Sequence, residues 1–264
     1  MTITFKANPD GVYGAIQVNG NDAVVIGAQG ITQGAPAGFR NKIINGAFGI
    51  NQRVYVSGAA TTAGQYTLDR WKVTGTGGIT FSTVNNKTTV TIPAGQTLQQ
   101  VIEGLNLATG DYVLSWEGTA QGRIGAGSYG ASGSVKASIT GGTNTTIEFN
   151  TGTVANVQLE AGSIATPFEH RPYGLELSLC RNYYREMYFG IEAYGVGGQF
   201  ISQSCVFDSP MRATPTVGEQ FIDGNNVAAI DLSSVNKWYV WYKLTWTSSG
   251  SGFRRSILKI SAEL

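Results

Sequence analysis

The histidine and the two cysteines are the residues best suited to nucleophilic or metal chemistry, and their contexts favour neither. His170 is the single histidine, and Cys180 and Cys205 are the two cysteines. A nucleophile–histidine site would have to use His170, but no Gly-x-Ser-x-Gly elbow or nucleophilic cysteine context accompanies it. One histidine and two distant thiols cannot build a zinc site or a disulfide framework. We therefore predict no catalytic residue, no metal ligand and no cofactor, and two small buried thiols.

Carboxylates need a separate test, because a glycosidase requires only two of them. The 17 acidic residues occur singly, and the sequence gives no separation between any pair. Six of them are candidates to face a groove: Asp69, Glu103, Asp111, Glu117, Glu148 and Glu160. Single acids on alternating strands are more often solvated side chains. A polysaccharide depolymerase is therefore the least favoured function. Calcium binding by oxygen-rich loops stays open, although no Asp-x-Asp-x-Asp loop is present.

Aromatic side chains with polar neighbours suit the recognition of sugars. The chain has 5 Trp, 12 Tyr and 11 Phe. Tryptophan and tyrosine rings stack on sugar rings, while Asn, Gln and Asp side chains bind the hydroxyl groups. Trp71, Trp116 and Trp246 are expected in the core. For a second set, with polar or glycine-rich neighbours, core and contact roles are equally open: Tyr129, Tyr194 and Trp241.

A second candidate contact is the run Asp223-Gly224-Asn225-Asn226, which reads as a turn. Loop tips carry recognition in β-sandwiches, so Asp223, Asn225 and Asn226 join the predicted ligand contacts. The alternative is a plain hairpin turn with no binding role.

The composition argues against nucleic-acid-binding and membrane-inserted classes of protein. Charged residues make up 13% of the 264, about half the usual share, and the net charge is +1. No strong field would attract nucleic acid or an acidic membrane. No run approaches the ~18 apolar residues of a membrane span, and Met1 to Lys6 is too short for a signal peptide. We expect synthesis in the cytoplasm without a signal peptide, no membrane insertion, and no nucleic-acid partner.

Period-two patterns separated by Gly, Asn, Ser and Thr predict an all-β protein with four parts. Residues 1–38 contain strands too short to close a core alone, and residues 39–172 read as a sandwich or jelly roll. Residues 173–190 are predicted as a linking helix, and residues 191–264 as a C-terminal β-sandwich. The run "WYVWYKLTW" at 238–246 alternates strictly, and both of its faces are expected to be covered, with self-association as one source of cover. Residues 75–78 and 122–133 are glycine-rich and are predicted as long loops.

The helix prediction depends on one apolar stripe at four-residue spacing. Its members are Leu175, Leu179, Tyr183 and Met187. Pro172 precedes this segment and Gly190 follows it, which makes both plausible boundaries. We predict that the stripe contributes to an oligomer interface.

Four runs of this sequence resemble a module of bacteriophage tail-fibre and receptor-binding proteins. They are "NKIINGAFGINQR", "YTLDRWKV", "LQQVIEGLNLATGDYVLSWEG" and "VQLEAGSIATPFEHRPYGLELSLCRNYY". The resemblance covers roughly residues 40 to 190 and is carried mostly by structural residues. It implies a jelly roll of the carbohydrate-binding type whose Gln-Leu-Glu strand is the last of the sandwich, followed by a helix and a C-terminal β domain.

The same resemblance implies partners and a location. The N-terminal "ANPDGVYGAIQVNGNDAVVI" is similar to segments that attach phage fibres to other virion proteins of the baseplate, tail or capsid. Fibres of this kind are generally homotrimers. We therefore expect a virion protein, a tail fibre or capsid-attached fibre, that binds a host surface glycan without catalysis. The chain lacks the stalk of a typical long fibre, which leaves a purely structural fibre or decoration protein as the alternative.

Overall fold

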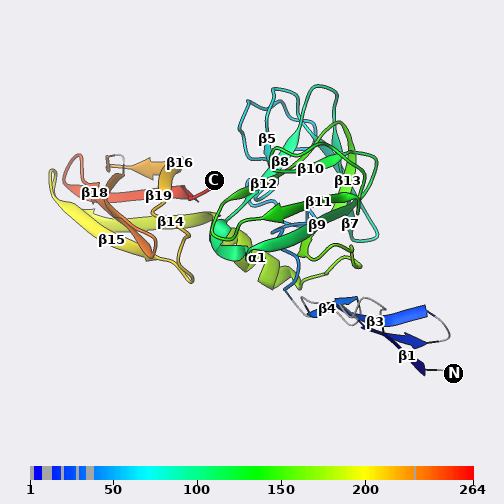
Figure 1. The fold of residues 1–264 in the computed structure, drawn as a ribbon. Coiled ribbons are helices and arrows are strands. Elements are labelled where there is room, and N and C mark those ends of the chain that lie inside the picture. The colour runs from blue at the N-terminus through cyan, green and yellow to red at the C-terminus, as the bar shows by residue number, and fades with distance from the viewer. Residues whose placement is uncertain (1–2, 8–13, 19–20, 28–29, 34–38, 229) are drawn as a thin grey trace. The chain divides into compact units, whose positions relative to one another are not determined.

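The structure, a computed structural model, describes residues 3–7, 14–18, 21–27, 30–33, 39–228 and 230–264. The fold is all-β with several antiparallel sheets and one α-helix among these residues (Figure 1). The first four strands pair in chain order into one antiparallel sheet: β1 (Ile3–Ala7), β2 (Gly14–Val18), β3 (Asn21–Gly27) and β4 (Gly30–Gln33). The predicted N-terminal strands are confirmed, while their side chains lie outside the described residues.

The central β-sandwich has one sheet of four strands and one of five. In the first sheet the order is β10 (Gly122–Ile124), β12 (Thr145–Phe149), β8 (Leu98–Ile102), β5 (Lys72–Val73). In the second it is β11 (Val135–Ile139), β9 (Gly110–Glu117), β13 (Gly152–Ala161), β7 (Lys87–Ile92), β6 (Thr80–Val84). From β7 onward successive strands alternate between the two sheets, which is the winding of a jelly roll. A short 3₁₀ helix, η1 (Gly104–Asn106), follows β8.

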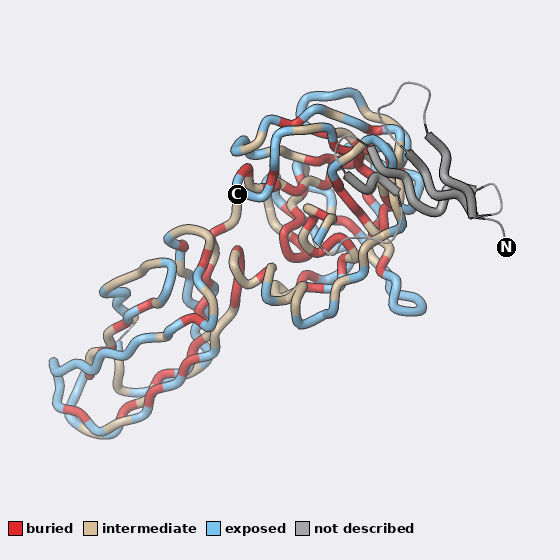
Figure 2. Tube along the Cα trace, turned by 60° about the horizontal axis from the view of Figure 1, so that its bottom comes forward, coloured by how far each residue is buried: buried red, intermediate tan, exposed pale blue. Residues whose placement is uncertain are grey.

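Buried residues gather inside this sandwich (Figure 2), and aromatic residues are among them. Trp71 is fully buried, and its ring centroid lies 6.1 Å from that of Phe149. Trp116 contacts the same Phe149 edge-on at 5.0 Å, and its Nε1–H donates to the Ala120 carbonyl. The core positions predicted for Trp71 and Trp116 are therefore confirmed.

The Pro-Phe-Glu-x-Arg-Pro run, residues 167–172, binds residues 39–43, where the chain enters the jelly roll. Glu169 accepts hydrogen bonds from the backbone N–H groups of Phe39 at 2.5 Å and Asn41 at 2.7 Å. Arg171 donates to the carbonyls of Ile43, at 3.0 Å, and Asn41. These contacts join residues about 130 positions apart, so the run acts as a clamp within this unit.

The Gln-Leu-Glu strand supplies the buried part of the same clamp. Glu160 accepts from the backbone N–H of Thr166 at 2.8 Å and from its hydroxyl at 2.6 Å. Gln158 donates to Glu160 at 2.8 Å, and the Arg40 guanidinium lies 3.3 Å from the other carboxylate oxygen. Glu160 and Gln158 are almost fully buried, and β13 is the last strand before the helix. The run therefore stabilises the sandwich.

The helix is shorter than the sequence pattern predicts. It is α1 (Tyr173–Arg181), and the prediction that it continues to residue 190 is wrong. The next element is a strand, β14 (Tyr184–Gly195), which pairs with twelve residues of the last strand. A spacing of four residues repeats on one face of a helix and also on one face of a strand, because four is an even number. The pairing of residues 184–195 with the last strand shows that this segment is a strand.

This correction changes the predicted oligomer interface. Tyr183 follows the helix and is 3% exposed, and Met187 lies on β14 against the core of its own unit. Neither residue belongs to a helical stripe with Leu175 and Leu179, which are half-buried on α1. The oligomer role of Leu175 and Leu179 stays a prediction.

The C-terminal part is a second, smaller sandwich of two three-stranded sheets. One sheet has the order β14, β19 (Gly250–Ser261), β16 (Thr216–Asn225). The other has the order β15 (Phe200–Val206), β18 (Tyr239–Thr245), β17 (Asp231–Val235). Val240, Tyr242, Leu244 and Trp246 are buried, which confirms the alternation predicted for this run. Trp238, assigned to the same face, lies just before β18 and is 53% exposed.

This second compact unit comprises Pro172–Leu264 together with two short segments, Ile50–Val54 and Leu68–Arg70. Arg70 is buried, stacks on the Tyr183 ring at 3.5 Å and pairs with Glu263. Burying a guanidinium is tolerated when it is paired in this way. Tyr183 therefore packs within its own chain.

Candidate functional site

One face of the four-stranded sheet carries a continuous row of polar side chains. The register places Lys72 beside Gln99, Gln99 beside Glu148, and Glu148 beside Arg123. Their neighbours along each strand are core residues: Trp71 and Val73, Leu98, Ile147 and Phe149, and Ile124. Side chains alternate between the two faces of a strand, so the four polar residues share the face that points away from the core. The row crosses all four strands.

A tyrosine stands at each end of the row. Tyr66 forms an isolated bridge with Lys72, whose ammonium lies 5.9 Å from the Tyr66 ring centroid. At the other end the Arg123 guanidinium lies 4.7 Å from the ring centroid of Tyr129. Both tyrosines are partly exposed. Residues 122–133, predicted as a long loop, begin instead with β10, because Arg123 and Ile124 pair with β12. The rest of the segment carries Tyr129 to the face.

Glu148 is the buried centre of this row, with 4% exposure. Arg123 lies 2.5 Å from Oε1, which also accepts a hydrogen bond from the Tyr129 hydroxyl group, while Gln99 donates to Oε2. Burial alone would raise the pKa of Glu148, but hydrogen bonds from Tyr129 and Gln99 and the charge of Arg123 outweigh it. The net effect lowers the pKa below its usual value. Glu148 is therefore ionised at neutral pH and fixes its three partners in place.

Tyr129 keeps its proton for the complementary reason. Burial, followed by the hydrogen bond to Glu148 and the nearby carboxylate charge, raises its pKa to about 12. The hydroxyl group is consequently a hydrogen-bond donor to Glu148 over the whole physiological range. The ring of Tyr129 is thus held in one orientation beside Arg123.

The lowered pKa of Glu148 predicts a specific acid sensitivity. An unfolded glutamate titrates near pH 4.3, so the stability that the ionised form contributes is complete above that pH. It is lost as the pH falls through the lower folded pKa. We expect the stability of Glu148→Gln to fall less than that of the native chain over this interval. Urea unfolding at pH 6 and at steps below pH 4.5 measures the difference; parallel curves would contradict the assignment.

Two further polar pairs extend the face beside the row. The Thr74 and Thr97 hydroxyl groups lie 2.6 Å apart, and Thr74 N–H donates to the Thr97 carbonyl at 3.3 Å. On the same side of the row, next to β10 and β12, Gln121 N–H donates to Asn150 Oδ1 at 2.9 Å. The face therefore presents hydroxyl and amide groups in addition to its charges.

The carboxylates singled out from the sequence each have their own partners. Glu148 lies in the row. The others contact Gln52 and Arg53 (Asp69), Ser138 (Asp111), Lys87 and Asn156 (Glu117), and Arg40 and Thr166 (Glu160). Glu103 is partly exposed at the end of β8. In the described part of the chain these contacts unite no two of the six in one site.

The histidine and the thiols are placed without a shared site. His170 is exposed and meets the Phe168 ring edge-on at 4.8 Å. Cys180 is fully buried, and burial raises the pKa of its thiol, while Cys205 is half-buried with its pKa also raised by burial. Among the described residues, no group of three His, Cys, Asp or Glu side chains is arranged to hold a metal ion. No described helix has the length and apolar character needed to cross a membrane.

The other predicted contact residues divide between the two sheets of the C-terminal unit. Tyr194, Asp223 and Asn225 lie on the outer face of the sheet β14-β19-β16, where Asp223 pairs with Arg255 at 3.1 Å. Trp241 lies on the outer face of the sheet β15-β18-β17. The six predicted contacts therefore do not form one site.

The predicted turn at residues 223–226 is wrong. Asp223, Gly224 and Asn225 belong to β16 and pair with β19, after a register shift that follows Phe221. Asn226 has a positive φ of 58°, and its side-chain oxygen accepts hydrogen bonds from Thr247 and Ser248. This register shift is a β-bulge, and it lets β16 continue through residues that the sequence pattern assigns to a turn. Asn226 consequently organises a loop of its own unit.

Comparison of the chain with protein-family models, curated proteins and solved structures finds no match in any of the three. The resemblance to phage receptor-binding modules therefore stays a prediction. What the site can do has to be inferred from its geometry.

Most of the row cannot be recognised from sequence patterns alone. Tyr66, Lys72 and Gln99 lie in runs that carry the resemblance, but no motif assigns them, or Arg123, a binding role. The available signal is that Lys72, Gln99 and Glu148 are polar residues next to core positions in three separate strands. Only the strand order brings them side by side.

Proposed function

We propose that this chain binds a carbohydrate through the face of Lys72, Gln99, Glu148 and Arg123, with Tyr66 and Tyr129 at its two ends, and that it does so without catalysis. The observation that carries the proposal is the arrangement itself. Four polar residues lie in register across four strands, and an aromatic ring stands at each end.

The chemistry of the row matches the surface of a sugar. Lys72 and Arg123 supply N–H donors, and Gln99 supplies an amide that can both donate and accept. Glu148 spans Gln99, Tyr129 and Arg123, so these side chains are ordered before a ligand arrives. Pre-ordering reduces the entropy lost on binding. The tyrosine rings offer apolar faces to the C–H groups of the sugar.

The state of Glu148 supports binding rather than hydrolysis. Glycoside hydrolysis needs a general acid with a raised pKa and a second carboxylate at a defined distance. Glu148 has a lowered pKa, and both of its oxygens are engaged. It is the one carboxylate of the row. This residue is better suited to fixing donors than to transferring a proton.

The biological setting is part of the same proposal. A virion fibre protein that attaches to a host surface polysaccharide would use such a face, with the sheet β1–β4 attaching the chain to other virion proteins. Homotrimeric assembly is the expected form. These roles are supported by the sequence resemblance.

The test is binding of the full-length protein to an array of bacterial surface oligosaccharides, with the mass in solution measured by light scattering. We expect saturable binding to a subset of oligosaccharides, and no new reducing ends after prolonged incubation. Binding to none of them would favour the structural fibre or decoration role. Shortening of the bound polysaccharide would instead establish a depolymerase.

A further inference from the structure

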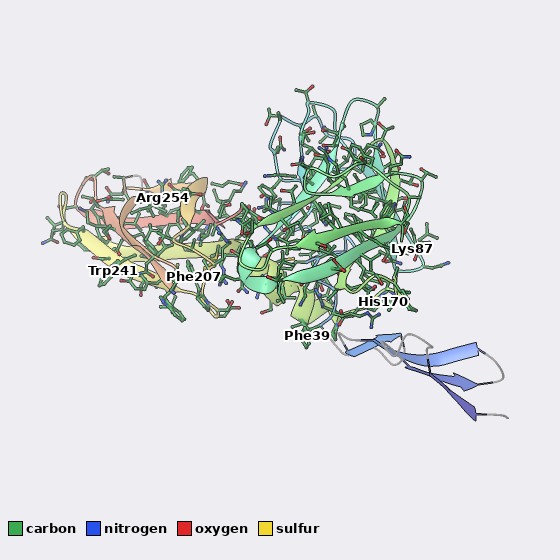
Figure 3. The ribbon with its side chains drawn as sticks, in the orientation of Figure 1. Phe39, Lys87, His170, Phe207, Trp241 and Arg254 are labelled. Atoms are coloured by element: carbon green, nitrogen blue, oxygen red, sulfur yellow. The ribbon has the colours of Figure 1, made fainter. Side chains whose placement is uncertain are left out.

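The outer face of the sheet β15-β18-β17 presents one tryptophan at its centre. Trp241 lies in the middle of the central strand β18 and is 46% exposed (Figure 3). Its neighbours in the strand, Val240 and Tyr242, are buried in the core of the unit. Within one chain the face that carries Trp241 is open, so the core supplies one of the two covers expected for this strand, and a cover by self-association stays a prediction.

The residues beside Trp241 leave its ring accessible. Ser204 of β15 and Ser234 of β17 are its cross-strand partners. Both are small, so neither side chain can cover an indole ring. The Ser233 hydroxyl group donates to the Trp241 carbonyl at 3.2 Å and fixes the backbone at the irregularity in β17. Trp241 thus forms a flat apolar platform between two hydroxyl groups.

Polar and aromatic groups continue along the same strand. Tyr239 precedes Trp241 by two residues, and Lys243 follows by two and pairs with Asp231 at 3.3 Å. Residues two apart on a strand are separated by about 7 Å on one face, which is close to the width of a sugar ring. A ring stacked on Trp241 would therefore have hydrogen-bonding groups within reach on either side.

The composition of this face distinguishes a sugar from a second copy of the chain. Besides Trp241 the face carries Phe200, Val206 and Tyr239, and its other residues are polar: Ser202, Ser204, Ser234, Asp231, Lys243 and Thr245. The cores of subunit interfaces are depleted in Ser, Lys and Asp, because burying them removes their hydration without replacing it. A tryptophan flanked by serines on both neighbouring strands suits a partly hydrated polyhydroxylated ligand.

We infer that Trp241 is the stacking platform of a second carbohydrate site, which takes one pyranose ring between Ser204 and Ser234 beside the Lys243–Asp231 pair. The inference shares its ligand class with the proposed function and uses a site in the other unit. Its success therefore does not depend on the jelly-roll face.

The test uses the full chain, the best-binding oligosaccharide of the array, and the indole N–H signals in NMR spectra. Trp241→Phe and Trp238→Phe assign the two signals. Trp238 is the matched control, because it is 53% exposed and precedes the same strand. We expect the Trp241 signal to shift on titration in the native chain and in Arg123→Ala, while the Trp238 signal stays fixed. Trp241→Ala should weaken the affinity measured in the Arg123→Ala background about tenfold or more, and Trp238→Ala should not.

The outcomes separate the two proposals. If binding disappears in Arg123→Ala and Trp241 never responds, the second site is wrong and the jelly-roll site stands. If Trp241 responds and Arg123→Ala binds like the native chain, the second site stands and the jelly-roll assignment fails. A native chain that binds no oligosaccharide contradicts both. A change of mass in solution on Trp241→Ala would identify this face as a subunit interface and overturn the inference.

Discussion

Replacement of Glu160 by alanine is expected to destabilise the jelly-roll unit by about 3 kcal/mol. The side chain is almost fully buried and accepts hydrogen bonds from both polar groups of Thr166 and from Gln158. Without it, the Arg40 guanidinium loses its charged partner at 3.3 Å, and the Thr166 N–H loses its acceptor. A buried group left without a partner costs more than the original bond contributed.

Amide hydrogen exchange measures this effect separately in each part of the chain. We expect peptides from β9 and β13 to lose about 100-fold of their protection, with peptides from β18 and β19 as the internal reference. Glu117→Ala is the matched control, because Glu117 is 53% exposed and its Lys87 partner is 50% exposed. That variant should lose less than about 1 kcal/mol. Equal losses of protection in Glu160→Ala and Glu117→Ala would show that the buried contacts of Glu160 stabilise the unit no more than an exposed ion pair does.

The second large effect is expected on binding, from Arg123→Ala. Arg123 supplies donors at one end of the row and lies over the Tyr129 ring. Its removal takes away these donors and leaves Glu148 without its charged partner. We expect the affinity for the best-binding oligosaccharide at the jelly-roll face to fall by about 30-fold or more. Titration calorimetry in the Trp241→Ala background isolates this face.

Lys136→Ala is the control for charge in this experiment. Lys136 is exposed on β11, in the other sheet of the jelly roll, so its removal changes the net charge equally and leaves the row intact. Its affinity should match that of the native chain. If both substitutions weaken binding alike, the attraction is a general effect of charge and the row is not the site.

The fold class and the strand patterns could be predicted because they depend on local periodicity. The alternation at 238–246 depends only on which side chains are apolar, and the core confirms it. The end of α1 could not be predicted, because the pairing of Tyr184 with Ser261 joins distant parts of the chain. The same four-residue spacing fits both structures until that partner is known.

The candidate site was largely beyond sequence analysis for a related reason. Periodicity tells which face of a strand a residue occupies, but not which strand lies beside it. Gln99 and Glu148 are 49 positions apart and become neighbours only through the order β10-β12-β8-β5. Tyr129 and Trp241 are partial exceptions, since their neighbours leave a contact role as open as a core role.

The most direct test of the proposed function is to observe the row itself while a sugar binds. The side-chain amide protons of Gln99 and the guanidinium protons of Arg123 give separate NMR signals, which Gln99→Ala and Arg123→Ala assign. On titration with the best-binding oligosaccharide, both sets of signals should shift together and saturate at the affinity measured by calorimetry. Saturable binding that leaves both sets unchanged would contradict the assignment of the jelly-roll face as the carbohydrate site.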